Sequence, residues 1–140
     1  MIPRNLYDSD HEMFRDSLRK FLEVEAMPHH EQWEKDGMVS DEIWLKAGEQ
    51  GFLCPMIPEE YGGLATDFRY NCIVNEEIGR SGCTGLGWTL HNDITVPYIV
   101  RYGSEEQKKK YLPRFITGEL ITAIAMTEPG AGSDLQGIRT

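Results

Sequence analysis

Residues 124–134 read "IAMTEPGAGSD", and they mark the point where the character of the chain changes. The run before the glycines, "LITAIAMT" at 120–127, is short, apolar and partly β-branched. Such a run predicts a β-strand, and the glycines after it predict a turn that leaves backbone N–H groups exposed. A strand end of this kind is a typical place to hold an anion.

The glycine turn fits neither of two common phosphate-binding motifs. A dinucleotide fingerprint that starts at Gly130 would need a third glycine at position 135, and a P-loop would need a lysine after its glycines. Two interpretations remain. In the first, Gly130 and Gly132 adopt positive φ, and their N–H groups join those of Met126 and Thr127 around a phosphate. In the second, Pro129 sets the φ of an ordinary hairpin turn.

Toward the N-terminus the sequence predicts helices, because apolar residues recur at helical spacing between capping residues and glycines. We expect helices over residues 9–27, 29–36, 40–50, 66–80, 84–102 and 104–113. Proline cannot donate a helical hydrogen bond, so Pro28 is expected to interrupt the first helix and Pro113 to end the last. A capping box is expected at Ser9 with Glu12, and another at Ser104.

The predicted fold is mainly α and has two parts. Residues 1–118 are expected to form an all-helical N-terminal domain, and residues 119–140 to begin a middle β domain that is cut short. A lone strand cannot satisfy its own N–H and C=O groups, so further strands are expected outside this sequence.

Composition excludes several classes of protein. The net charge is −9 over 140 residues, with a pI near 4.9, so a nucleic acid is not an expected partner. Three cysteines without paired spacing fit neither a disulfide framework nor a zinc site, which favours a reducing compartment. No apolar run reaches the roughly 18 residues of a membrane span. The N-terminus resembles no signal or transit peptide, which favours bacterial cytoplasm, with the mitochondrial matrix as the alternative.

The stretch "AMTEPGAGSDLQGIRT" closely resembles the flavin-binding signature of the acyl-CoA dehydrogenase family. The match carries, in order, Thr127, Glu128, Gly132, Ser133, Asp134 and Gly137. The stretches "PEEYGG" at 58–63, "YGSEEQKKKYLPRFITGE" at 102–119 and "LRKFLEVEAMPHHEQWEKDGMVS" at 18–40 agree with the same family. The resemblance covers nearly the whole chain, and it is strongest to the long-chain members.

The resemblance implies FAD-dependent oxidation of a fatty acyl-CoA to its trans-2-enoyl-CoA in fatty acid β-oxidation. Electrons would pass to electron-transfer flavoprotein, and the full-length enzyme would be a homotetramer. Family members consist of an N-terminal helical, a middle β and a C-terminal helical domain, so this chain is expected to be the N-terminal piece and inactive alone. The catalytic base, a glutamate of later helices, is expected outside it, and Glu128 matches a structural position.

The resemblance also implies which residues bind ligands. The expected flavin-binding residues are Ile124, Ala125, Met126, Thr127, Glu128, Pro129, Gly130, Ala131, Gly132 and Ser133. The expected substrate-binding residues are Ser133, Gly87 and His91. Gly87, with Gly85, would leave room for a long acyl chain. Close packing between helices explains these glycines equally well, and a buried, satisfied imidazole is an alternative for His91.

No metal site is expected, because the adjacent His29 and His30 diverge on a helix. A second class of function stays open. The chain could be a non-catalytic helical binding module that retains a vestigial flavin turn. Bound flavin, visible as colour, would separate the two classes.

Overall fold

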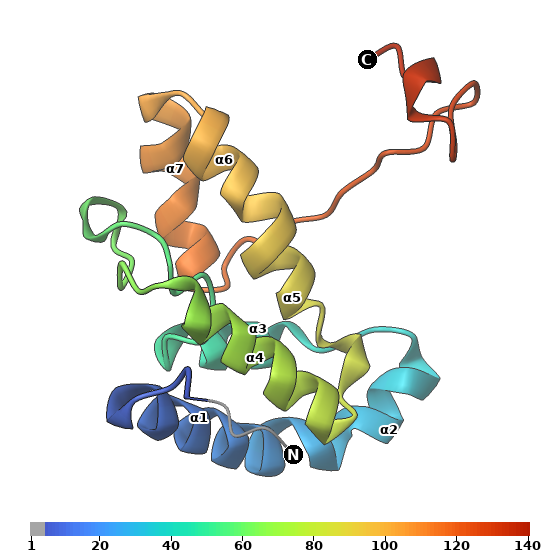
Figure 1. The fold of residues 1–140 in the computed structure, drawn as a ribbon. Helices are drawn as coiled ribbons and strands as arrows, with labels where there is room; N and C mark the ends of the chain where they lie inside the picture. Colours follow the sequence, from blue (N-terminus) through green and yellow to red (C-terminus); the bar gives the residue numbers. More distant parts are fainter. Residues whose placement is uncertain (1–4) are drawn as a thin grey trace.

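The computed structural model describes residues 5–140 as a helical body from which a C-terminal segment extends (Figure 1). The α-helices are α1 (Ser9–Phe21), α2 (Met27–Asp36), α3 (Asp41–Glu49), α4 (Phe68–Ser81), α5 (Trp88–Leu90), α6 (Val96–Tyr102) and α7 (Glu105–Ile116). Two π-helical turns are η1 (Leu22–Ala26) and η4 (His91–Thr95), and three 3₁₀ turns are η2 (Glu59–Tyr61), η3 (Thr84–Leu86) and η5 (Leu135–Gly137). The mainly helical fold predicted from the sequence is confirmed.

The sequence analysis expects Pro28 and Pro113 to interrupt or end helices, but neither proline does so. The turn η1 joins α1 to α2 without interruption, and Pro28 lies in the first turn of α2. In this π turn the Met27 N–H donates to the Leu22 carbonyl, five residues back, and such a local change of hydrogen-bond register accommodates a proline that lacks an N–H within a continuous helix. Pro113 likewise lies inside α7, which continues to Ile116. Residues 9–36 therefore form one long helical rod.

The helix caps are partly as predicted. The box at Ser104 is confirmed, since its hydroxyl accepts the N–H of Gln107 at 3.2 Å and the Gln107 side chain accepts the Ser104 N–H at 2.8 Å. The box expected at Ser9 is wrong, because the N-cap is Asp8, whose carboxylate accepts the His11 N–H at 3.3 Å. A carboxylate at this end also interacts favourably with the helix dipole.

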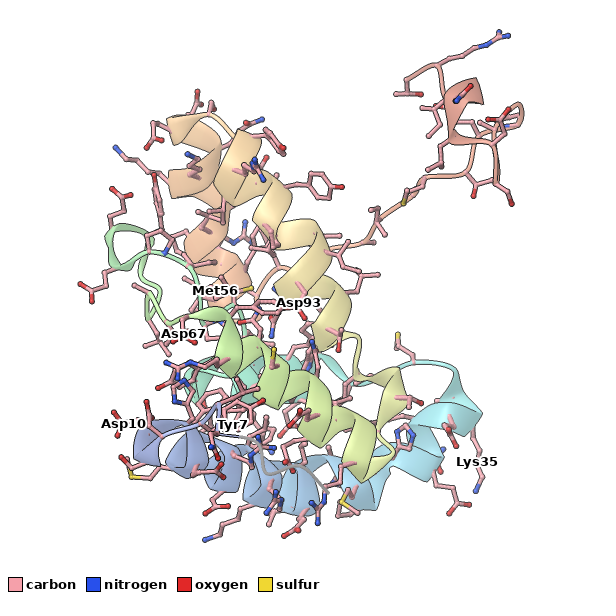
Figure 2. All side chains as sticks on the ribbon, viewed as in Figure 1. Tyr7, Asp10, Lys35, Met56, Asp67 and Asp93 are labelled. Carbon is pink, nitrogen blue, oxygen red and sulfur yellow. The ribbon has the colours of Figure 1, made fainter. Side chains whose placement is uncertain are left out.

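Two apolar clusters hold the helices together. The larger packs α1, α3 and α4 around Trp88, which is completely buried. The smaller packs the loop after Gly51 against α6 and α7. Asp93 of η4, labelled in Figure 2, ties the continuous helical segment α5–η4–α6 to α4 by accepting hydrogen bonds from Asn71 and, at 2.6 Å, from Asn75. These two hydrogen bonds thus fix η4 against α4.

An ion network lies between α1 and α4. Glu77 is only 2% exposed, and its carboxylate accepts hydrogen bonds at 2.9 Å from Arg15 and Arg19. Burial by itself would raise the pKa of Glu77, but the hydrogen bonds from Arg19 and Arg15 outweigh burial and lower that pKa. The carboxylate is therefore ionised and is satisfied by two guanidinium groups of the facing helix.

The segment after α7 begins close to α3. Gly118 has φ of 77°, and a Cβ built on it would lie 2.4 Å from the Trp44 carbonyl oxygen, so glycine is required there. Beyond it, residues 121–127 run extended in Figure 1, yet residues 5–140 contain no strand and only one isolated bridge, Glu128 with Ala131. The expected strand has no partner here, as a strand requires. The domain boundary at 118 stays a prediction.

We predict that Glu77→Gln lowers the free energy of unfolding by about 2–3 kcal/mol, because two guanidinium groups lose their buried counter-charge. Urea unfolding followed by tryptophan fluorescence measures this. Glu31→Gln, which removes one partner of an exposed pair with Lys35, is the matched control and should leave the free energy of unfolding nearly unchanged. Equal stability of wild type and Glu77→Gln would contradict the role of the network.

Candidate flavin turn and its anchor

The glycine turn is a tight hairpin turn. The Glu128 N–H donates to the Ala131 carbonyl at 2.9 Å, and the Ala131 N–H donates back to the Glu128 carbonyl at 3.1 Å. Pro129 and Gly130 occupy the two central positions. The expectation of positive φ at Gly130 and Gly132 is wrong, since neither has a left-handed backbone. The turn closes through its own hydrogen bonds, so it does not need left-handed residues.

The carboxylate of Glu128 joins the glycine turn to residues 139 and 140 at the C-terminal end of the chain. It accepts the backbone N–H of Arg139 at 3.0 Å and that of Thr140 at 3.1 Å, and also the Thr140 hydroxyl. The hydrogen bond from the Thr140 side chain and those from the two N–H groups lower the pKa of Glu128. The carboxylate is therefore engaged by donors of residues 139 and 140, and its role beside the flavin stays a prediction.

Several backbone donors beside the turn are free. Within residues 5–140, the N–H groups of Met126, Thr127, Gly132 and Ser133 have no hydrogen-bond partner. A Cβ built on Gly132 would meet nothing within 4 Å, so open space adjoins this backbone. Free amides beside an open backbone suit the oxygens of a diphosphate, because hydrogen bonds to a charged acceptor are strong. The donor set therefore fits the phosphate portion of a flavin nucleotide.

The flanking apolar side chains of this segment are uncovered. Ile124 is 39% exposed and Met126 is 56% exposed, and Ala125 is exposed as well. Neighbouring apolar side chains on a surface indicate a region that contacts another surface or a ligand. This region coincides with the expected flavin-binding residues 124–127.

Gly87 lies in a different part of the molecule. The helix expected from residue 84 begins only at Trp88, after η3, and Gly87 between them has φ of 70°. A Cβ built there would lie 3.7 Å from Trp44, which is an ordinary contact distance. The left-handed backbone, rather than close helix packing, is what requires glycine at this position. Its role in making room for an acyl chain stays a prediction.

His91 is completely buried at the start of η4. Its Nε2 lies 3.1 Å from the Phe115 carbonyl oxygen, and its Nδ1 lies 2.9 Å from the Thr122 hydroxyl. The rings of Trp44 and Phe115 pack edge-on against the imidazole. Burial lowers the pKa of His91, and the hydrogen bond to Phe115 offsets only part of this effect. Both ring nitrogens already have protein partners. The role of His91 in binding the substrate stays a prediction.

The structure brings some of the predicted site residues together and leaves others apart. Residues 128–131 form one turn that residues 132 and 133 follow directly, whereas Gly87 and His91 belong to the helical body. Among the described residues, no hydrogen bond or ion pair joins residues 123–140 to residues 5–120. Figure 1 shows this C-terminal segment extending away from the helical body. Thr122, which the sequence analysis did not single out, is the last residue bonded to that body.

Neither a metal site nor a membrane span is found in the part of the chain that the structure describes. Across residues 5–140, no group of three His, Cys, Asp or Glu side chains is placed to hold a metal ion. No helix in that range combines the length and the apolarity that crossing a bilayer requires.

Comparison with known proteins gives a consistent result. Residues 8–119 match the family model described as "Acyl-CoA dehydrogenase, N-terminal domain". The chain is 55% identical over 137 residues to "Long-chain specific acyl-CoA dehydrogenase, mitochondrial" of Sus scrofa, covering 98% of this chain and 32% of that protein. The chain thus spans about a third of the length of the long-chain relatives it matches.

Solved structures agree with the sequence matches. An acyl-CoA dehydrogenase from Geobacillus kaustophilus superposes with a TM-score of 0.92 at 56% identity, covering 97% of this chain and 36% of that one. An acyl-CoA dehydrogenase complexed with FAD from Bacillus anthracis superposes with a TM-score of 0.87 at 37% identity, covering 99% and 24%. These matches confirm the family predicted from the motifs.

We predict that stability falls as the pH drops below about 6.5, the ordinary pKa of histidine. The native state keeps His91 neutral while the unfolded chain takes up a proton, so the free energy of unfolding falls by up to about 1.4 kcal/mol per pH unit. Above that pH, His91 adds no pH dependence to the free energy of unfolding, because it is neutral in both the native and the unfolded state. Urea unfolding of wild type and His91→Gln between about pH 5 and 7.5 measures the contribution as the difference between the two curves. A constant difference would contradict it.

Proposed function

Because the chain belongs to the acyl-CoA dehydrogenase family, we propose that it forms the N-terminal domain of an enzyme that oxidises a fatty acyl-CoA to its trans-2-enoyl-CoA. FAD is the proposed cofactor, and long-chain acyl-CoA is the proposed substrate, as the names of the first relatives suggest. The observation that carries the proposal is the set of free N–H groups beside the open backbone of Gly132.

The proposed flavin contacts divide between the two sides of the turn. The Met126 amide and the Thr127 amide and hydroxyl would donate to the isoalloxazine edge, and Gly132 and Ser133 would donate to the diphosphate. When bound, FAD supplies the redox chemistry by accepting the hydride that leaves the β carbon. A hydroxyl donor at the pyrimidine end stabilises negative charge that develops there. The remaining expected residues of 124–131 would line the site.

The substrate would meet this chain at few points. Ser133 would touch the thioester, and Gly87 would leave room for the acyl tail. His91 is completely buried, so it would act on the substrate only through the residues that it holds. The base that removes the α proton is proposed to lie on a later part of the enzyme, which agrees with the engagement of the Glu128 carboxylate by Arg139 and Thr140.

Partners and compartment follow from the family and stay proposals. Electron-transfer flavoprotein would accept the electrons, and the full-length enzyme would be a homotetramer. Relatives named as mitochondrial occur in animals and plants, and one probable acyl-CoA dehydrogenase is from Bacillus subtilis. These names support both compartments considered above, the mitochondrial matrix and the bacterial cytoplasm.

We predict that the purified chain binds FAD weakly and that Gly132→Ala weakens this binding about tenfold. The backbone of Gly132 accepts an alanine without a clash, so the fold stays intact, but the methyl group occupies the space next to the donors. Titration of FAD, followed by flavin fluorescence, gives the dissociation constants. Gly79→Ala on the exposed side of α4 is the matched control, since a Cβ there also meets nothing within 4 Å.

Two results would count against the proposal. If millimolar FAD leaves the flavin fluorescence of the wild-type mixture unchanged, the helical binding module with a vestigial turn becomes the better description. If Gly132→Ala and Gly79→Ala bind FAD as wild type does, the turn is not the binding site.

We predict that Gly87→Leu in the full-length enzyme shifts the preferred substrate to shorter acyl chains. Any side chain at Gly87 strains the left-handed backbone, at a cost of about 1 kcal/mol, so Gly87→Ala serves as the control that adds strain with little bulk. The measurement is kcat/KM across a series of acyl-CoA lengths. A profile that is the same for both variants would mean that Gly87 serves only the backbone.

A further inference from the structure

His91 is a buried titratable residue without direct access to a ligand, and its surroundings define its tautomer. The Phe115 carbonyl can only accept, so the Nε2 atom, at 3.1 Å, carries the proton and donates it. Nδ1 is then an acceptor. It accepts hydrogen bonds from the hydroxyl of Thr122 at 2.9 Å and from the backbone N–H of Thr122 at 3.3 Å. The imidazole therefore bridges α7 and Thr122 in one fixed orientation.

The environment of the imidazole keeps it neutral. It contacts the rings of Trp44 from α3 and Phe115 from α7, and it hydrogen-bonds to Thr122. No ionisable side chain is among these neighbours. Because the proton of the Thr122 hydroxyl goes to Nδ1, that hydroxyl can accept the single proton of the Thr95 hydroxyl, for which the Leu90 carbonyl at 3.2 Å is the alternative acceptor. Thr122 is thus held by two residues of η4, His91 and Thr95.

Thr122 is where the C-terminal segment leaves the helical body. No hydrogen bond joins residues 123–140 back to residues 5–120 within the described chain. Met126 is four residues further on, so its amide lies within roughly 13 Å of the anchor. A change of about 10° in the exit direction moves that amide by about 2 Å, which exceeds the tolerance of a hydrogen bond. The direction set at Thr122 therefore decides where the free donors lie.

We propose that His91 is a positioning residue for the flavin. As a neutral imidazole protonated at Nε2, it ties Thr122 to the Phe115 carbonyl and fixes the direction in which residues 123–127 leave the helical body. This direction sets the affinity of residues 126–133 for the flavin nucleotide. The first part concerns the anchor alone, and the second part rests on the function proposed above.

The first experiment tests the anchor by NMR without any ligand. Long-range ¹H–¹⁵N correlation should show the Nε2–H tautomer of His91 in the wild-type protein at neutral pH. His91→Phe keeps an aromatic ring but removes both hydrogen bonds, so the Thr122 amide should exchange at least tenfold faster and the ¹H–¹⁵N NOE of residues 122–126 should fall. His91→Gln should restore both, because its carboxamide offers an N–H donor and an oxygen acceptor at a similar separation.

Two further variants keep this test decisive if His91→Phe folds poorly. Thr122→Val removes only the hydroxyl and retains the backbone N–H, so the NOE should fall to an intermediate value. Thr117→Val is the matched control, since its exposed hydroxyl bonds only to the Arg114 carbonyl, and it should leave the NOE unchanged. An Nδ1–H tautomer, or wild-type NOE values in Thr122→Val, would overturn the anchor.

The second experiment tests the effect on flavin affinity. FAD titrated into the same proteins should bind roughly fivefold more weakly to Thr122→Val, which is the loss of about one hydrogen bond's contribution, and more weakly still to His91→Phe, which also loses the bond from the Thr122 N–H. His91→Gln should recover most of the affinity. If the ¹H–¹⁵N NOE values of residues 122–126 fall in these variants while their affinity for FAD stays unchanged, the positioning role is overturned. If the wild-type protein binds no FAD, the proposed function fails, while the NMR comparison still decides the anchor.

Discussion

The need of every backbone N–H and C=O group for a hydrogen-bond partner governs this structure. Helices meet the need internally, so residues 9–116 fold into a body that carries nearly all of the buried side chains. The extended residues 123–127 cannot meet it alone, and their donors stay free. The same constraint thus explains both the stable body and the segment that is available for a ligand.

Two buried polar groups in particular help to give the helical body its definite geometry, because they lie among partners that suit them. Glu77 is matched by two arginines across α1 and α4. Asn92 accepts the Cys54 N–H at 2.8 Å and donates to the Phe52 carbonyl at 3.1 Å, which shapes the loop beside α6. A shifted helix would leave such a group unsatisfied in a low-dielectric interior, at a considerable cost in free energy.

The function proposed for this chain depends on position rather than on reactive side chains. The Glu128 carboxylate and the His91 imidazole are engaged by protein groups, and the candidate flavin donors are mainly backbone amides. Such donors act only where the fold holds them, so the proposed function depends on how the helical body is connected to the turn. That connection passes through Thr122, which ties residues beyond α7 to the π turn η4.

The sequence alone determined what depends on neighbouring residues: the helical periodicity, the cap at Ser104 and the ordered motif at 127–137 that carries the family resemblance. Tertiary structure decided the rest. The π turn η1 carried the rod past Pro28, and the turn's own hydrogen bonds left Gly130 without positive φ. His91 and Thr122 are 31 residues apart, so no local pattern could pair them, because only the folded core brings them within hydrogen-bond distance.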